Sequence, residues 1–240
     1  MNDKIRNELA PHGRLRAGIN MSNFLLVTGR SNSGEPQGVS PDMARAIAER
    51  LGVDVEYITF DTPAQVTDAS TSDIWDIANI GAEPERARTI TFTPAYAEIE
   101  ATYIVAAGSS LQTIDDVDKP GVKIVAYGRG AYGLWLADNL KYAELIKVDG
   151  MDASFQMFVE QNLDALAGLR PRLIQDVERL PGARLLDGKF SSVQQAIGTK
   201  PSRQASAEFL CQFVAEAKAS GFVQELIAKH GVEGKLTVAS

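Results

Sequence analysis

The sequence predicts an α/β fold in which parallel-rich sheets are flanked by helices. Runs of alternating or continuous apolar residues, typical of strands, are followed repeatedly by runs with apolar residues every three or four positions, typical of helices. Parallel strands need long crossover connections, so this repeated alternation favours parallel sheets covered by helices. The chain has 240 residues, of which 45% are hydrophobic, and this suits one large domain or two of modest size.

The first half of the chain is expected to hold three strands, one long helix and one helical turn. Ser40 is expected to cap the helix, with Pro41 at its first position. Gly52 follows the last apolar residue of that helix and can supply a left-handed stop. The strands are expected at 14–19, 53–57 and 74–80, and the single turn at 83–88.

The second half of the chain repeats the alternation and ends in a long amphipathic stretch. Trp75 and Trp135 both fall within apolar-periodic runs, so both are expected in the core. Strands are expected at 101–107, 122–127, 145–148, 163–167 and 193–197, and helices at 128–139, 154–161 and 205–230.

Composition excludes several classes of function. The net charge is −7 and the pI is near 5.0, so no basic surface for nucleic acid or an anionic membrane is expected. The one cysteine, Cys211, cannot form an intramolecular disulfide and is interpreted as a small core residue. His12 and His230 are interpreted as surface residues near the chain ends. Neither a histidine metal site nor a catalytic triad is therefore expected, and no cofactor is expected.

The N-terminal residues carry no apolar core of the kind found in a signal peptide. No run approaches the roughly 18 apolar residues of a membrane-spanning helix. Two explanations stay open at this point: a signal has been removed from this sequence, or the protein stays in the cytoplasm.

Several motifs follow one another in the order found in a known family. Residues 37–53, QGVSPDMARAIAERLGV, resemble the P-x-G-F-D-x-D-L-A helix of the type II periplasmic solute-binding proteins, the amino-acid-binding receptors of import systems. Residues 83–88, EPERAR, resemble the family's T-P-E-R turn, and residues 92–96, FTPAY, resemble its F-S-x-P-Y segment. Further matches lie at 74–78, 113–117, 164–168 and the terminal helix. Each motif alone is weakly specific, but the ordered set covers nearly the whole chain.

The resemblance implies a two-lobed fold whose lobes are joined by two crossing strands, near 102–107 and 193–199. Lobe one would combine residues 1–105 and 195–240, and lobe two would hold residues 106–194. Hinged lobes close on a ligand because the closed state makes contacts that the open state cannot. The implied function is capture of a small carboxylate-bearing or amino-acid-like molecule in an interlobe cleft. The implied protein is a periplasmic monomer that serves an ABC permease and is not an enzyme.

Arg86 matches the family arginine that grips the ligand's carboxylate, and a guanidinium can pair with two oxygens at once. A surface arginine paired with neighbouring glutamates is the alternative interpretation. The resemblance also places a polar contact and an aromatic cover after the first strand, and backbone contacts after the third. These further candidates for ligand binding are Asn20, Asn23, Phe24, Asn79, Gly81 and Glu83.

Gly128, Gly130 and Gly133 match the pattern G-x-G-x-x-G between a strand and a helix, and Asp149 follows the next strand. This pattern is typical of dinucleotide-binding folds, so a nicotinamide-dependent oxidoreductase is one alternative function. In a binding protein, the same glycines could form a nest of backbone N–H groups for an anion, helped by Arg129. A plain tight turn is the third interpretation.

Leu169 and Arg170 follow the strand at 163–167, where amino-acid receptors of the family place an aspartate for the ligand's ammonium. An ammonium without a counter-charge is costly to bury, so a ligand without an amine is expected unless Glu83 replaces the aspartate. Arg170 is expected to help hold an anion. Residues 118–122, DKPGV, and 139–143, NLKYA, resemble segments of the cyclohexadienyl dehydratases, which are enzymes with this same fold and are a further alternative. Their general acid would lie at this same place, where the chain has no carboxylate.

Overall fold

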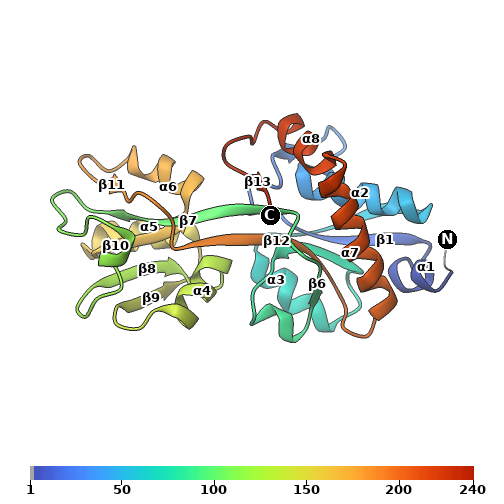
Figure 1. The fold of residues 1–240 in the computed structure, drawn as a ribbon, viewed down its shortest axis with the longest axis horizontal. Coiled ribbons are helices and arrows are strands. Elements are labelled where there is room, and N and C mark those ends of the chain that lie inside the picture. The colour runs from blue at the N-terminus through green and yellow to red at the C-terminus, as the bar shows by residue number, and fades with distance from the viewer. Residues whose placement is uncertain (1–2) are drawn as a thin grey trace. The chain divides into compact units, whose positions relative to one another are not determined.

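The computed structural model describes residues 3–240 and divides into two compact units. Of the described residues, unit 1 contains 3–98 and 194–240, and unit 2 contains 99–193. Two strands run from one unit into the other, β7 (Ala97–Val105) and β12 (Ser191–Thr199), as Figure 1 shows. Unit 1 is therefore built from two separate stretches of the chain, and unit 2 from one.

The sheet of unit 1 has the strand order β4-β1-β5-β12. Strand β1 (Arg14–Asn20) is parallel to β4 (Asp54–Phe60) and to β5 (Ile77–Gly81), whereas β12 is antiparallel to β5. The carboxyl ends of β1, β4 and β5 therefore lie at one edge of the sheet. Short strands complete the unit: β2 (Gly29–Arg30), β3 (Pro36–Gln37), β6 (Thr91–Phe92) and β13 (Thr237–Val238).

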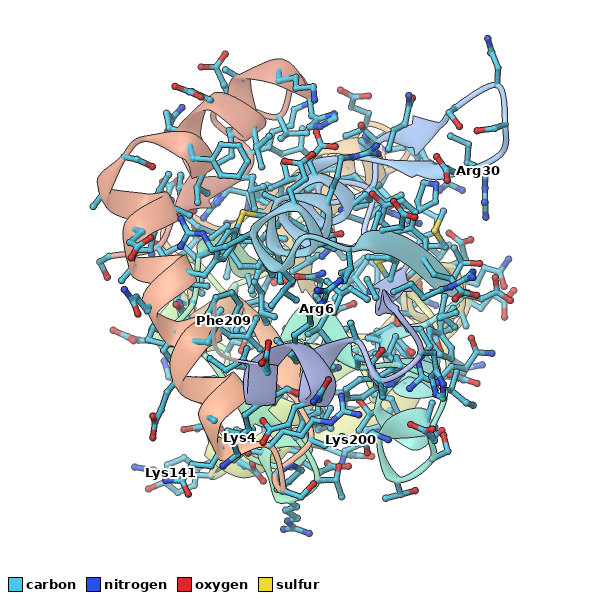
Figure 2. The ribbon with its side chains drawn as sticks, turned by 90° about the vertical axis from the view of Figure 1, so that its right-hand side faces the viewer. Lys4, Arg6, Arg30, Lys141, Lys200 and Phe209 are labelled. Carbon is cyan, nitrogen blue, oxygen red and sulfur yellow. The ribbon has the colours of Figure 1, made fainter. Side chains whose placement is uncertain are left out.

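Helices pack on the sheet of unit 1, and α1 lies beside α7, as Figure 2 shows with Arg6 on α1 and Phe209 on α7. The Oγ atom of Ser206 on α7 donates a 2.5 Å hydrogen bond to Glu8 on α1, which fixes this contact. The helices of the unit are α1 (Asp3–Leu9), α2 (Val39–Leu51), α3 (Pro63–Asp68), α7 (Gln204–Ala219) and α8 (Phe222–Lys229), with 3₁₀ turns η1 (Ala69–Thr71) and η2 (Arg86–Arg88).

Helix α2 begins at Val39 and is capped two residues before the predicted cap, so the prediction for Ser40 is wrong. The cap is Gly38, which has a φ of 149° and no side chain to offer. A Cβ atom at Gly38 would lie 2.2 Å from the carbonyl oxygen of Leu26, so only glycine fits there. Ser40 instead lies inside the first turn, where its backbone N–H donates to Leu26. At the other end, the prediction for Gly52 is confirmed, because its φ of 66° is left-handed.

The expected terminal helix is divided into α7 and α8 by Gly221, whose φ of 83° is left-handed. Of the two tryptophans, Trp75 is fully buried, and its Nε1 atom donates to the carbonyl oxygen of Val66 at 3.1 Å. Trp135 is only half-buried, with its ring 5.5 Å from that of Phe190, so its assignment to the core is wrong.

Unit 1 also contains a buried carboxylate, Asp76, whose side chain is 0% exposed. Arg16 donates to it from Nε at 2.9 Å and from Nη2 at 2.9 Å. Arg203, just before α7, donates from Nη1 at 3.0 Å. Asp73 pairs with the same Nη2 atom of Arg16 at 2.8 Å but is exposed. The carboxylate of Asp76 thus joins the neighbouring strand β1 to the start of α7.

The sheet of unit 2 has the strand order β7-β10-β8-β9. Strand β8 (Lys123–Tyr127) is parallel to β9 (Glu144–Val148) and β10 (Ala165–Leu169), and β10 is antiparallel to β7. The remaining elements are α4 (Ala131–Asn139), α5 (Met151–Glu160), α6 (Arg170–Val177), η3 (Ile114–Asp116) and β11 (Arg184–Leu185). Val125 and Leu166 from the sheet pack with Phe155 and Phe158 of α5 in the core of the unit.

Candidate functional site

The unit 1 candidates gather at the carboxyl edge of its sheet. β1 ends at Asn20 and β5 ends at Gly81, and these parallel strands are direct neighbours. Asn20 uses its Oδ1 atom to accept hydrogen bonds from the N–H of Ser22 at 3.1 Å and from its hydroxyl at 2.8 Å. Asn23 accepts from the backbone in the same way, and Phe24 beside it is half-buried. The two asparagines therefore shape the turn after β1.

Arg86 is the buried cation of this edge, with only 2% of its surface exposed. It lies in η2, five residues after the end of β5, and its Nη1 atom donates to the carbonyl oxygen of Gly81 at 2.8 Å. Glu83 between them is 8% exposed. A buried guanidinium attracts anions more strongly than an exposed one, because water does not screen it. The interpretation of Arg86 as a solvated surface arginine is therefore wrong.

Two buried amides lie next to Gly81. Asn79 precedes it by two residues on β5 and donates from Nδ2 to the carbonyl oxygen of Ser40 at 3.5 Å. Gln195 on β12 is the cross-strand partner of Gly81 and is 3% exposed. Gln195 was not among the sequence candidates. The predicted strand at 193–197 holds two adjacent glutamines, and nothing in the local pattern distinguishes Gln195 from Gln194.

In unit 2, the glycine motif serves packing. The N–H of Gly128 donates to the carbonyl oxygen of Val148 at 3.0 Å, and the N–H of Gly130 donates to that of Tyr127 at 3.1 Å. A nest that directs both amides at an anion is therefore not formed. A Cβ atom at Gly133 would lie 2.0 Å from the carbonyl oxygen of Tyr127, so this glycine lets α4 approach β8 closely. Arg129 within the motif is exposed.

Replacing Gly133 by alanine is expected to destabilise the protein by about 1–3 kcal/mol, because the added methyl group overlaps a backbone carbonyl. Urea denaturation measures the loss. Gly29→Ala is the matched control, since a Cβ atom at Gly29 meets nothing within 4 Å. Equal stability of the two variants would contradict the packing role.

Leu169 and Arg170 lie at the end of β10, and both take part in local structure. Leu169 is the buried residue that precedes α6, and Arg170 is the first residue of that helix. The Nε atom of Arg170 pairs with Glu100 at 2.7 Å, and its Nη2 atom donates to the carbonyl oxygen of Gly188. The charge of Arg170 is therefore already compensated, so the expectation that it helps to hold an anion is not supported.

A second polar cluster in unit 1 was missed, because His230 was interpreted as a surface residue. Its side chain is only 11% exposed, and its Nε2 atom lies 2.8 Å from Oδ2 of Asp42 on α2. Lys229 donates to the same oxygen at 2.7 Å. Burial raises the pKa of Asp42, but the hydrogen bonds from Lys229 and His230 outweigh this and leave the pKa below its usual value.

Asp42→Asn is expected to lower the free energy of unfolding by about 1 kcal/mol at neutral pH. Because the pKa of Asp42 is lower in the folded state, the contribution is present above the unfolded pKa near 4 and disappears as the pH falls through the folded pKa. The difference in stability between wild type and variant is therefore expected to shrink as the pH is lowered from 7 to below 4, which unfolding curves at several pH values measure. The exposed Asp54→Asn is the control. A difference that grows as the pH falls below 4 would contradict this account.

Across residues 3–240, no three or more histidine, cysteine, aspartate or glutamate side chains gather where they could hold a metal ion. Within the same residues, no helix has the length and apolar character needed to cross a membrane.

The fold and this site define a class of protein: two α/β units joined by two strands, with a buried arginine at a sheet edge. Residues 15–233 match the family model described as bacterial extracellular solute-binding proteins, family 3. The chain belongs to this family and is a solute-binding protein with the type II periplasmic-binding fold.

Solved structures share this fold at low sequence identity. A mutant of ArgBP from T. maritima is 20% identical with a TM-score of 0.72, covering 96% of this chain and 100% of that one. The ancestral amino-acid-binding protein AncCDT-1, a precursor of cyclohexadienyl dehydratase, is 20% identical with a TM-score of 0.71, covering 93% and 97%. A histidine kinase sensor domain with similarity to periplasmic binding proteins is 17% identical with a TM-score of 0.74, covering 95% and 99%.

One curated relative is the cyclohexadienyl dehydratase of Pseudomonas aeruginosa. It is 28% identical over 141 residues, which are 57% of this chain and 52% of that protein. The matched region thus spans about half the length of the relative.

Proposed function

We propose that this protein is the receptor of an ABC-type importer, acts outside the cytoplasmic membrane, and captures a small carboxylate-bearing solute without chemically changing it. Membership of an extracellular solute-binding family supports the location and the role. The preference for a carboxylate is inferred from Arg86, a buried arginine at the carboxyl edge of the unit 1 sheet. Such a group can hold two carboxylate oxygens in a bidentate pair.

We further propose that the preferred ligand has no amine. The end of β10 presents Leu169 and Arg170. The carboxylate of Glu100 pairs with Arg170 and also lies 3.6 Å from Lys189, so two cations already compensate its charge. An ammonium buried without a counter-charge would cost several kcal/mol, on the order of 3–5. Glu83 is the remaining acidic candidate. Calorimetric titration of an amino acid and of its 2-oxo analogue tests the proposal. Tighter binding of the amino acid, both to wild type and to the Glu83→Gln variant, would contradict it.

A thermal-shift screen against amino acids, 2-oxo acids, hydroxy acids, dicarboxylates and aromatic acids is the first experiment. A ligand present at about 100 times its dissociation constant adds about 2.7 kcal/mol of stability, which is readily measured. Small-angle scattering of the protein with the best ligand is expected to show a smaller radius of gyration, because hinged binding proteins close on their ligands. The absence of any stabilising carboxylate would contradict the proposed function.

The match to a cyclohexadienyl dehydratase makes an enzymatic role the second candidate. A dehydratase needs a general acid near the leaving group. The end of β10 offers Leu169 and Arg170, and arginine does not donate a proton at neutral pH. Incubation with a cyclohexadienyl acid is therefore expected to leave the ultraviolet spectrum unchanged. The appearance of aromatic absorbance would favour the enzyme.

The nicotinamide-dependent alternative is disfavoured by the packing of its glycines. The N–H groups of Gly128 and Gly130 already bond to carbonyl oxygens, and Gly133 faces Tyr127. Tight binding of NAD in the same thermal-shift screen would favour this alternative.

A further inference from the structure

Asn79 and Gln195 carry two buried amide groups beside Gly81, on neighbouring strands of unit 1. Gln195 on β12 is the antiparallel partner of Gly81, and Asn79 lies two residues before Gly81 on β5. Side chains alternate along a strand, and cross-strand partners share a face. Asn79 and Gln195 therefore project from the same face of the sheet as diagonal neighbours, a separation that long side chains can span.

The oxygen atoms of both amides lack a donor from the protein. Among the described residues, no group donates a hydrogen bond to Oδ1 of Asn79 or to Oε1 of Gln195, although the two residues are only 2% and 3% exposed. Buried acceptors are nearly always paired, because an unpaired one loses its hydration without compensation. Both oxygen atoms are hydrogen-bond acceptors, so the group that forms the missing hydrogen bonds must be a donor.

The two amide-bearing residues adjoin Gly81, whose carbonyl oxygen is bonded to Arg86. Gly81 is the cross-strand partner of Gln195, and its carbonyl oxygen accepts from Nη1 of Arg86 at 2.8 Å. Gly81 is thus the structural link between Arg86 and the two neutral acceptors. A hydroxyl group matches them, because it donates one hydrogen bond and brings no charge that would need a counter-ion.

We propose that Gln195 and Asn79 determine specificity by accepting a hydrogen bond from a hydroxyl group of the ligand, so that the solute is a hydroxycarboxylate. This inference rests on the proposed function, in which Arg86 holds the carboxylate. A site built to accept a hydroxyl discriminates strongly against an analogue without one, since its buried acceptors are then left unpaired.

The test compares hydroxy and oxo acids of identical skeleton by calorimetry: lactate with pyruvate, malate with oxaloacetate, and phenyllactate with phenylpyruvate. Wild type is expected to bind the hydroxy acid of the best pair at least about tenfold more tightly. Gln195→Met and Asn79→Leu are expected to abolish this preference while changing affinity for the oxo acid less than about threefold, since they keep the bulk and remove the acceptor. Gln194→Met is the matched control. Its amide lies on the opposite face of β12 and donates to Glu98 at 2.9 Å.

Unfolding of the ligand-free variants separates a ligand site from an internal water site. A trapped water would also donate to both oxygens, and removing its partners would then lower stability and leave the preference unchanged. That outcome overturns the inference, as does equal wild-type affinity for the members of every pair. The inference is supported if the variants lose the preference for the hydroxy acid while their stability is unchanged or raised. If no carboxylate binds wild type at all, the proposed function fails together with this inference, so the two failures are distinguishable.

Discussion

Replacing Arg86 by alanine is expected to weaken carboxylate binding by about 2–5 kcal/mol, or roughly 30-fold to several thousandfold. Arg86 is 2% exposed, so the ligand's charge would lose a partner that water cannot replace. Isothermal titration of the folded variant measures the change. Arg86→Lys keeps the charge but loses the two-pronged geometry, and it is expected to fall between wild type and Arg86→Ala.

Arg88→Ala is the control for this result. Arg88 belongs to the same 3₁₀ turn as Arg86, but it is exposed. Its removal is expected to leave affinity within about twofold, because exposed charges contribute little. Equal effects at the two positions would show that general electrostatics, and not a specific pair, holds the ligand. Unchanged affinity in a folded Arg86→Ala variant would exclude the carboxylate role.

Asp76→Asn is expected to cause the largest loss of stability, about 3–5 kcal/mol. The carboxylate is fully buried and accepts from both Arg16 and Arg203, so its neutralisation leaves two guanidinium groups without their main counter-charge. Urea denaturation measures the free energy of unfolding. Asp73→Asn is the control. It removes an exposed partner of the same Arg16, and its effect is expected to be much smaller.

A double variant tests whether the loss of stability at Asp76 comes from the arginines left without a counter-charge. Replacing Asp76 and Arg203 together is expected to cost less than the sum of the two single changes, because the second change removes a cation that the first one stranded. Additive losses would show that the ion pair itself contributes little.

The order of strands and helices could be predicted because hydrophobic periodicity is a local property of the sequence. Gly52 was predictable for the same reason, since a left-handed helix stop needs only the residue itself. Ser40 was not, because the start of α2 is decided by the close approach of the backbone at Leu26 to Gly38. Trp135 shows the same limit: an apolar period tells which face of a helix is covered, but not how completely.

The candidate site could be predicted where the family motif fixes the position, as for Arg86. What the sequence could not show is the partner of each charge. Arg170 is paired with Glu100, which is 70 positions away, and His230 is paired with Asp42, which is 188 positions away. Gln195 lies beside Gly81 only because β12 returns to pair with β5. Such pairings depend on the register of distant strands, which no local pattern encodes.

The passage of the chain through β7 and β12 has a consequence for synthesis. Residues 99–193, the whole of unit 2, are synthesised before residues 194–240. Unit 1 must wait for strands β12 and β13 and for helices α7 and α8, and Ser206 on α7 is the residue that bonds to Glu8. Domains generally fold as units, from the N-terminal end first, but here the later-starting unit is the first to be complete. The emerging chain therefore holds a half-formed unit 1, with one edge of β5 unpaired, until nearly all of it has been translated.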